Sequence, residues 1–516
     1  MMLRRVLTAG ILLATALALA TVAVPRGEPD TFNLGALGAE GFPVGRQEGK
    51  SLNLPKDTLG VRVLNVPDGT PAADAGLKVE DIIVGTARGM FLKKRDPIYT
   101  LIEHLEGASG QKNGTLKLMI LREGKNTALD VKLPFLGKHS KTCPVGCERC
   151  DRITAESLAW LAGIQGEDGS FEAGTGGVNG KVVVTTWCGL AFLASGSTPN
   201  SGAYADNIKR AGVYVMENCG REEMWPGMGG GGGGDGGSGG GGEDGGGTGP
   251  ASGGGGGGML PGGRVRGNNW NQTNWPLSIA PWLLCELALK EKTPELMAKL
   301  EEIGERLLAN QERTGGWAHG PGGPNALGYV ELEIMSNYAL ASLGMMRRLE
   351  IELPQGPIDK ALAYVEATSA GDGGVGYSTQ PGQQGNGDPG RTAGAIVAFS
   401  RLGKKAHPFF KKMGSFLKSH MEDLPNGHVS PVMHFLASAF ACQELAPEYW
   451  SQFMELFHLE IMAARRPDGS FTARPTEESQ QLHSNTDRDM GPAWTTGSYL
   501  LILQLKKGNL QTVTGK

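Results

Sequence analysis

The chain has 516 residues, which is too long for one ordinary hydrophobic core, so the length predicts two or more domains. Its formal net charge is −4, with 49 basic and 53 acidic side chains in mixed order. This balance lacks the basic footprint of a nucleic-acid-binding protein and does not suggest a polybasic membrane surface. Hydrophobic residues make up 40% of the chain, a share that is diluted by 82 glycines, many of them in one tract.

Residues 1–24 have the pattern of a secretory signal peptide. Arg4 and Arg5 precede an uncharged apolar run from Val6 to Val24. Small residues that suit cleavage lie at Ala18, Ala20 and Ala23. The alternative is an uncleaved anchor, since the run approaches the ~20 residues that span a bilayer. Both predict an exported protein (periplasmic, extracellular or anchored facing outward) that contacts a membrane only if this segment is uncleaved.

Residues 30–136 predict a small α+β domain. A strand at 61–66 is followed by a turn and a short helix, which Thr70 caps, Pro71 begins and Gly76 ends. Next come a strand at 81–84, a helix at 98–105 and a strand pair at 115–122 and 126–133.

This order and the run DGTPAADAGLKVEDII at 68–83 resemble the PDZ domains of exported bacterial proteases. The resemblance implies that backbone N–H groups of a glycine-containing loop hold the C-terminal carboxylate of a peptide. The peptide then adds as a strand beside the domain's second strand. The loop expected here is Leu37-Gly38-Ala39, and Leu59-Gly60-Val61 is the alternative. The alternative is that the domain binds no peptide and packs only against its own second half.

From residue 153 to 508 the chain repeats one unit: a helix, a turn of Gly, Asp or Asn type with a bulky residue, and a more apolar helix. Phe171 and Trp225 in these turns are about 54 residues apart, and Trp317 and Tyr377 about 60. A glycine-rich insertion at 227–263 interrupts one unit and predicts a flexible loop. Six such hairpins predict an all-α (α/α)6 toroid, a closed ring whose inner helices line a cavity.

The turns resemble the Gln-Trp repeats of terpene cyclases and the toroids of protein prenyltransferase β-subunits and complement thioester domains. The resemblance implies a fold rather than an activity, because no D-x-D-D or G-C-G-E-Q sequence is present. A terpene-cyclase-like activity ranks third, after the two functions given below. Its diphosphate substrates are cytoplasmic, whereas this chain is predicted to be exported. The order of PDZ-like domain and toroid resembles a family of secreted bacterial proteins and implies no particular chemistry.

In such a ring the turns before the inner helices meet at one rim, so polar residues distant in sequence converge on the cavity mouth. We expect an acid–base pair of Glu331 or Glu333 with His428 or His434, and an anion contact from Arg391. The alternative is that these are helix-end charges and histidines that bond to carbonyls. The run Asp487-Arg488-Asp489 is interpreted as a solvated loop. The full set of candidates is His319, Glu331, Glu333, Asp388, Arg391, His428, His434, Trp494 and Tyr499.

The predicted linker at 137–152 contains four side chains of the type that zinc prefers: His139, Cys143, Cys147 and Cys150. Exported proteins also use such cysteines in disulfides, so a disulfide or free thiols are the alternative. We expect no cofactor beyond this zinc.

Two functions rank above the cyclase-like activity. The first is an exported protein that binds protein C-termini or extended peptides through the PDZ-like domain, with the toroid as a scaffold or ligand-binding domain. The second is an extracytoplasmic enzyme that hydrolyses a glycan or other polymer, or cleaves it by elimination, in the toroid cavity.

Overall fold

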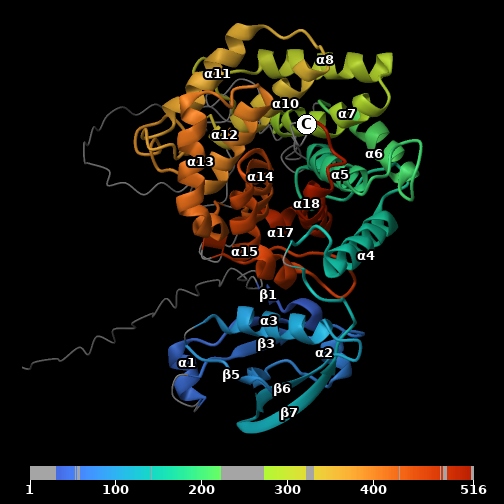
Figure 1. Cartoon of the computed structure of the whole chain (residues 1–516), viewed down its shortest axis with the longest axis vertical. Helices are drawn as coiled ribbons and strands as arrows, with labels where there is room; N and C mark the ends of the chain where they lie inside the picture. The colour runs from blue at the N-terminus through green and yellow to red at the C-terminus, as the bar shows by residue number, and fades with distance from the viewer. Residues whose placement is uncertain are drawn as a thin grey trace, which may run out of the picture.

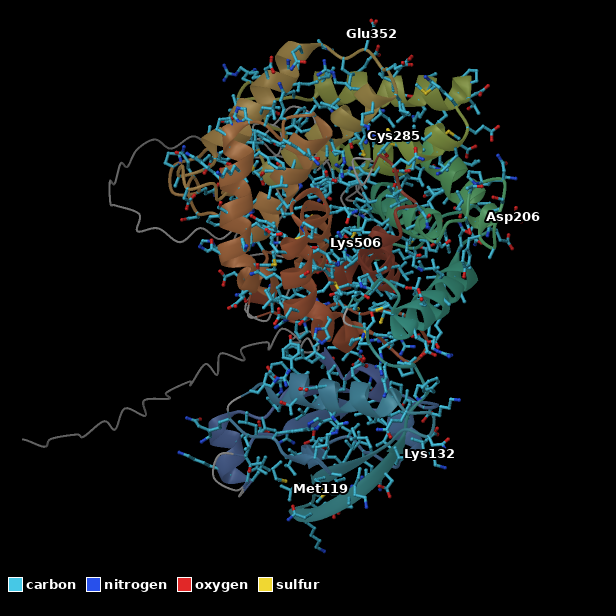
Figure 2. All side chains as sticks on the ribbon, in the orientation of Figure 1. Met119, Lys132, Asp206, Cys285, Glu352 and Lys506 are labelled. Atoms are coloured by element: carbon cyan, nitrogen blue, oxygen red, sulfur yellow. The ribbon has the colours of Figure 1, made fainter. Side chains whose placement is uncertain are left out.

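The computed structural model divides the chain into a small antiparallel sheet domain and a mostly helical domain (Figure 1). It describes residues 31–52, 54, 58–93, 95–140, 142–221, 272–320, 331–428, 430–476, 478–479 and 485–512. The predicted signal peptide at 1–24 and the glycine-rich insertion at 227–263 lie outside the described residues. Figure 2 shows the side chains of both domains, with Met119 and Lys132 on the sheet and the exposed Asp206 and Glu352 on the helical domain.

The sheet domain has seven strands, all paired antiparallel, in the order β1-β2-β3-β4-β6-β7, with β5 beside β4. The elements expected at 61–66, 81–84, 98–105, 115–122 and 126–133 are present near those bounds. The strands are β1 Phe32–Asn33, β2 Glu40–Pro43, β3 Val61–Asn65, β4 Ile82–Thr86, β5 Gly89–Met90, β6 Thr115–Arg122 and β7 Lys125–Lys132. The helices are η1 Gly35–Leu37, α1 Arg46–Ser51, α2 Pro71–Asp74 and α3 Pro97–Ser109.

The strand β2 has a neighbour on each side, which the sequence did not predict. It pairs with β3 on one edge and with the chain's own β1 on the other, where Phe32 lies opposite Gly41 and Asn33 opposite Glu40. A peptide that adds to β2 needs the edge that β1 uses here.

Six helices of the helical domain contact one another in a closed circuit: α5 touches α7, and the contacts continue through α10, α12, α14 and α18 back to α5. Helix α5 is the one described helix that is long and apolar enough to cross a membrane, but 83% of it is buried inside the domain. These inner helices are α5 Gly177–Ala194, α7 Asn274–Lys290, α10 Glu333–Arg348, α12 Pro389–Arg401, α14 Pro431–Glu444 and α18 Pro492–Gln504.

The remaining long helices lie outside this circuit, each against one or two inner helices. Their polar sides face solvent and their apolar sides cover the inner helices, as expected for amphipathic helices. They are α4 Glu148–Ile164, α6 Ala205–Asn218, α8 Pro294–Ala309, α11 Gln355–Ala367, α13 Pro408–His420 and α15 Pro447–Ala464. Short elements are η2 Met421–Asn426, α17 Thr486–Met490 and η3 Leu505–Lys507.

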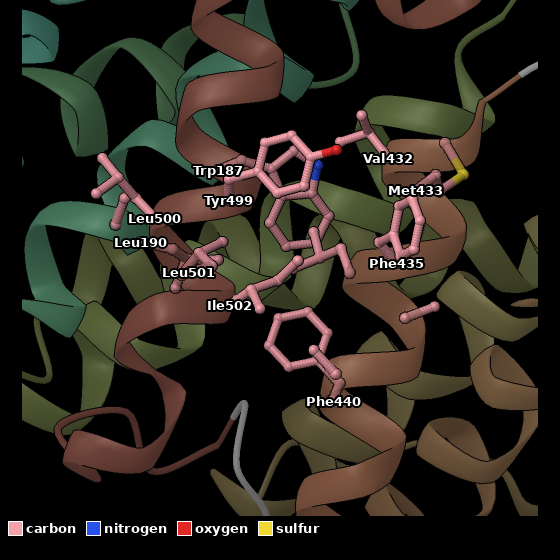
Figure 3. Packing of buried hydrophobic residues seen from close by; sticks show 14 of the residues in the cluster. Trp187, Leu190, Val432, Met433, Phe435, Phe440, Tyr499, Leu500, Leu501 and Ile502 are labelled. Atoms are coloured by element: carbon pink, nitrogen blue, oxygen red, sulfur yellow. The ribbon is translucent and has the colours of Figure 1, made fainter. Parts of the chain in front are cut away.

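Aromatic side chains fill the middle of the circuit. Trp187 of α5 lies 5.4 Å from Trp282 and 6.4 Å from Phe440 between ring centroids, and Tyr338 contacts both tryptophans. Figure 3 shows Trp187, Phe440 and Tyr499 reaching this interior from α5, α14 and α18. The interior of the circuit is therefore packed around these rings, and open space remains nearer the first turns of the inner helices.

The sheet domain packs against the helical domain through α3, η1 and β1, all of which contact α15 (Figure 1). The side-chain amide of Asn33 donates to the carbonyls of Ala463 (2.7 Å) and Arg465 (2.8 Å) at the end of α15. Glu460 of α15 accepts hydrogen bonds from Tyr99 of α3 and from Arg474. The two domains thus share a polar interface as well as an apolar one.

Candidate functional site

A cavity of about 370 Å³ opens where the first turns of the inner helices meet. Proline at the first helical position and a capping side chain fix two of these starts: Asp388 caps α12 and Ser430 caps α14. The backbone N–H groups of a helix start carry partial positive charge, so this convergence favours an anion. The lining residues on the inner helices include Asn179, Trp275, Ile334, Arg391, Met433, His434 and Trp494.

Arg391 is the charged side chain best placed for such an anion. It is 8% exposed, and its guanidinium lies 4.9 Å from the centre of the Tyr377 ring. Its backbone N–H donates to the Asp388 cap at 2.8 Å, but among the described residues its guanidinium makes no hydrogen bond or ion pair. A buried, unpaired guanidinium that lines a cavity is the arrangement that binds carboxylate or sulfate.

His428 forms a histidine–carboxylate pair beside Arg391. Its Nδ1 lies 2.6 Å from Oε1 of Glu478, and its ring meets Tyr377 edge-on at 5.6 Å. Because an ionised carboxylate can only accept, Nδ1 is the donor and the Nε2 lone pair remains for proton transfer. The pair is about one-third exposed, since the side chains of His428 and Glu478 have exposures of 31% and 34%.

His319 also lines the cavity and is held in one tautomer. Its Nδ1 accepts a hydrogen bond of 2.8 Å from the indole Nε1 of Trp275, so the proton of the neutral ring sits on Nε2. Burial lowers the pKa of His319 to about 4. The ring is therefore a neutral hydrogen-bond donor at neutral pH.

This pKa predicts a pH-dependent stability. In the unfolded chain His319 takes up a proton below about pH 6.5, whereas the folded protein resists protonation until about pH 4. Stability is therefore complete at pH 7 and falls between pH 6.5 and 4, by on the order of 2 kcal/mol for this partly exposed group. Urea unfolding at pH 7 and pH 4.5 should show a smaller drop for His319→Gln than for the wild type. An equal drop in both proteins would contradict this account.

His434 is buried against two glycines and pairs with Asp388 rather than with Glu331 or Glu333. A Cβ on Gly390 or Gly427 would lie 2.3 Å from its ring, so both glycines are needed for this close approach. Its Nδ1 lies 3.4 Å from Oδ1 of Asp388. Burial lowers the pKa of His434, which makes the ring neutral at pH 7.

The predicted acid–base pairs with Glu331 or Glu333 do not form, because neither glutamate lines the cavity. Glu331 accepts from the hydroxyl of Thr314 at 3.0 Å. Glu333 is fully buried at the start of α10, and its carboxyl oxygens have no hydrogen-bond partner among the described residues. Burial raises the pKa of Glu333 well above its usual value. The predicted rim residue Tyr499 is also buried, beside Phe471.

Five residues of the predicted set line the cavity: His319, Arg391, His428, His434 and Trp494. Asp388 pairs with His434. Sequence reasoning missed Glu478, Asn179 and Trp275 as site residues. It interpreted Tyr377 only as the aromatic residue of a turn. The position of that turn before an inner helix was the signal that could have identified Tyr377 as a residue of the cavity.

The interpretation of Asp487-Arg488-Asp489 as a solvated loop is wrong for its first residue. Asp487 lies in the short helix α17 and is fully buried. Its carboxylate accepts from the hydroxyl of Ser430, from the backbone N–H of Val432 (3.0 Å) and from the indole of Trp494 (2.8 Å). Asp487 thus braces the floor of the cavity.

The predicted carboxylate loop Leu37-Gly38-Ala39 lies against the helical domain. Leu37 and Ala39 are fully buried. A Cβ on Gly38 would lie 2.7 Å from Pro467, and one on the neighbouring Gly35 would lie 3.1 Å from the carbonyl of Met462 in α15. The alternative loop, Leu59-Gly60-Val61, leads into β3, with Gly60 packed on Ile82. The first of these loops is covered by the domain interface.

A second site lies in the linker between the domains, where His139, Cys143, Cys147 and Cys150 place their ligand atoms within 4.8 Å of one another. Nδ1 of His139 is 3.8 Å from Sγ of Cys143 and 3.7 Å from Sγ of Cys147. The sulfurs of Cys143 and Cys150 are 3.0 Å apart, and all seven cysteines are free thiols. Hydrogen bonds from Cys143 and Cys150 lower the pKa of the Cys147 thiol. These four side chains can hold a metal ion.

Comparison with known protein families gives a match over the second half of the chain. Residues 264–513 are similar to a family described as a domain of unknown function (DUF6288). No curated protein matches the chain. The matched region begins before α7 and ends beyond α18 and η3. It carries most of the cavity, including Arg391 and His428, but neither the sheet domain nor the His139–Cys150 cluster.

Proposed function

We propose that the protein is exported and consists of a PDZ-like domain and an α/α toroid, and that the toroid cavity binds and cleaves an acidic glycan. The toroid is supported by the closed circuit of inner-helix contacts and by outer helices that each cover one or two of them. The PDZ-like assignment is supported by the glycine loop before β2 and by the Thr70-capped helix after β3. Export is supported by the signal pattern at 1–24.

The observation that carries the ligand class is the buried, unpaired guanidinium of Arg391 in a cavity surrounded by helix starts. The partly exposed aromatic side chains of Trp275 and Tyr377 share the lining and offer apolar faces for a sugar ring. A carboxylate on a sugar satisfies both features, because the charge meets Arg391 while the ring lies on the aromatic surface. The ligand class is therefore a glycan that contains uronic acids.

Elimination fits the site better than hydrolysis. Glycoside hydrolysis commonly uses two carboxyl groups that flank the bond, yet Asp489 is the one carboxylate among the described residues of the lining. In elimination, Nε2 of His428 removes the proton on the carbon next to the carboxylate. The electron pair of that carbon–hydrogen bond forms a carbon–carbon double bond as the bond from the adjacent carbon to the glycosidic oxygen breaks, and the leaving oxygen takes up a proton from solvent, which reaches the partly exposed His428 pair. Arg391 stabilises the negative charge that builds on the carboxylate.

The peptide-binding hypothesis has weaker support. The outer edge of β2 is paired with β1, and the predicted carboxylate loop is buried under α15 and Pro467. Capture of a C-terminus there requires β1 and the domain interface to open first.

The test is a panel of polymers incubated with the whole exported chain. We expect polygalacturonate, alginate or a glucuronate-containing polymer to give the ultraviolet absorbance of an unsaturated uronate, and neutral cellulose or xylan oligomers to give none. Quenching of tryptophan fluorescence reports binding independently, because two lining residues are tryptophans. Binding without a new double bond would overturn the reaction but keep the ligand class, and failure of every acidic polymer to bind would overturn both.

We also propose that the ion of the linker site is zinc. Three thiols and one imidazole form a set that zinc prefers, and tetrahedral zinc separates such ligand atoms by about 3.5–3.8 Å. The distances from Nδ1 of His139 to Sγ of Cys143 and Cys147 agree with this value, whereas the sulfurs of Cys143 and Cys150, 3.0 Å apart, would have to separate to hold the ion. Metal analysis of the protein purified without added chelator should find one zinc per chain.

A further inference from the structure

We infer that the metal at His139, Cys143, Cys147 and Cys150 joins the sheet domain to the helical domain and fixes their relative position. This inference rests on the proposed zinc. The ligands lie in and just after the segment that leaves β7 and enters α4, which is the covalent connection between the domains. Elements of both domains contact the ligands directly.

On the sheet-domain side, Glu106 of α3 holds the cluster. Its Oε2 lies 3.1 Å from Nε2 of His139, whose Nδ1 faces the cysteine sulfurs. A carboxylate on the second ring nitrogen fixes the tautomer and orientation of a metal-bound histidine. The N–H of Leu136 also donates to the carbonyl of Ser109 at the end of α3 (2.8 Å). The ligand loop is thus tied to α3 at two points.

On the helical-domain side, the cluster is built into the start of α4. Cys147 is the residue before the helix and Cys150 lies in its first turn. Arg149, which is 1% exposed, donates to the side chain of Glu106, to its carbonyl (2.5 Å) and to the carbonyl of Gly137 (2.9 Å). Arg149 therefore links α4 to α3 around the ligands.

A third contact comes from α15. The ring of His139 meets the ring of His458 edge-on, with 5.9 Å between centroids. The same helix binds Asn33 through its last carbonyls and Tyr99 through Glu460. The cluster and these contacts hold the sheet domain on the helical domain at separate points, so loss of the ion loosens the linker side while the α15 contacts remain.

The experiment compares the whole chain with and without its metal. We expect one zinc per chain, one calorimetric transition for the zinc-bound protein, and a lower, separate transition of the sheet domain after removal with a strong chelator. Cys147→Ser and Cys150→Ser should lose the zinc and split the transition in the same way. Cys285→Ser is the matched control, because Cys285 is a fully buried thiol of α7 that lies away from the sheet domain (Figure 2). It should keep both the zinc and the single transition.

A further variant changes the residue that holds the cluster on α3. Glu106→Gln should keep the zinc but weaken its affinity by about 10- to 100-fold, because it changes the partner of His139 and leaves the four ligands in place. It also weakens the ion pair with Arg149, so the sheet domain should be less firmly attached even with zinc bound. Absence of stoichiometric zinc, or a disulfide found by intact mass, would overturn the zinc assignment. A second outcome is stoichiometric zinc whose removal leaves one transition and an unchanged scattering profile. It would overturn the inference that the metal fixes the relative position of the domains and would leave the zinc assignment intact.

Discussion

Replacing Arg391 by glutamine is expected to weaken binding of an acidic oligosaccharide by about 10- to 150-fold, the equivalent of one lost charge-assisted hydrogen-bond pair. The guanidinium is 8% exposed and makes no hydrogen bond or ion pair within the described part of the chain. Inside the protein, its removal breaks only the contact with the Tyr377 ring and the attraction to the Asp388 carboxylate, so the main loss is that of the ligand contact. Fluorescence titration of the variant and of the wild type measures the change in Kd.

Two controls separate a specific anion contact from general charge. Arg391→Lys keeps the charge but not the planar fork, so it should recover part of the lost affinity. Arg488→Gln removes a positive charge from a side chain that is 45% exposed and lies beside the cavity residue Asp489. It should leave Kd within about threefold, since exposed charges are screened. Equal losses in Arg391→Gln and Arg488→Gln would contradict the assignment.

The rim of the cavity was predictable because helix periodicity fixes it. An apolar helix must turn inward, and its first turn then lies at a common opening, so Arg391, His428 and His434 could be placed from their position before or within these helices. The sequence also indicated the cluster of four candidate metal ligands in the linker, since their spacing within twelve residues brings them together in almost any compact loop. The second prediction depended on local order alone, whereas the first also required the helix pairs to close into a ring.

The partners of these residues could not be predicted in the same way. Glu478 lies 50 residues beyond His428, in a polar segment with no periodic pattern, and only the packing of the last hairpin brings the two together. The pairing of β1 with β2 rests on two residues, too few for any strand pattern. The burial of the predicted carboxylate loop depends on how the two domains pack against each other, and the sequence of either domain alone does not predict that packing.

Asp487 is a second residue whose role depends on tertiary packing, and its carboxylate ties three elements together. It lies on α17, it accepts from Ser430 and Val432 at the start of α14, and it accepts from Trp494 in the first turn of α18. Ser430 and Trp494 line the cavity. Burial raises the pKa of Asp487 to about 6, while the three hydrogen bonds pull it down. The carboxylate therefore stabilises the site and is itself costly to ionise.

Asp487→Ala should lower the free energy of unfolding by about 3–5 kcal/mol at pH 5, because three buried donors lose their acceptor. The folded pKa of about 6 lies above the usual 3.8, so the stability linked to this proton is complete below pH 4 and is lost as the pH rises through 6. The difference between wild type and variant should therefore shrink by up to about 3 kcal/mol from pH 4 to pH 8 in urea unfolding. Asp489→Ala, two residues away and 43% exposed, should cost less than about 1 kcal/mol at every pH. Two outcomes would contradict this account: equal losses of stability in both variants, or a loss in Asp487→Ala that grows with pH. Either would mean that the hydrogen bonds of the buried Asp487 carboxyl do not hold α14, α17 and α18 together at the floor of the cavity.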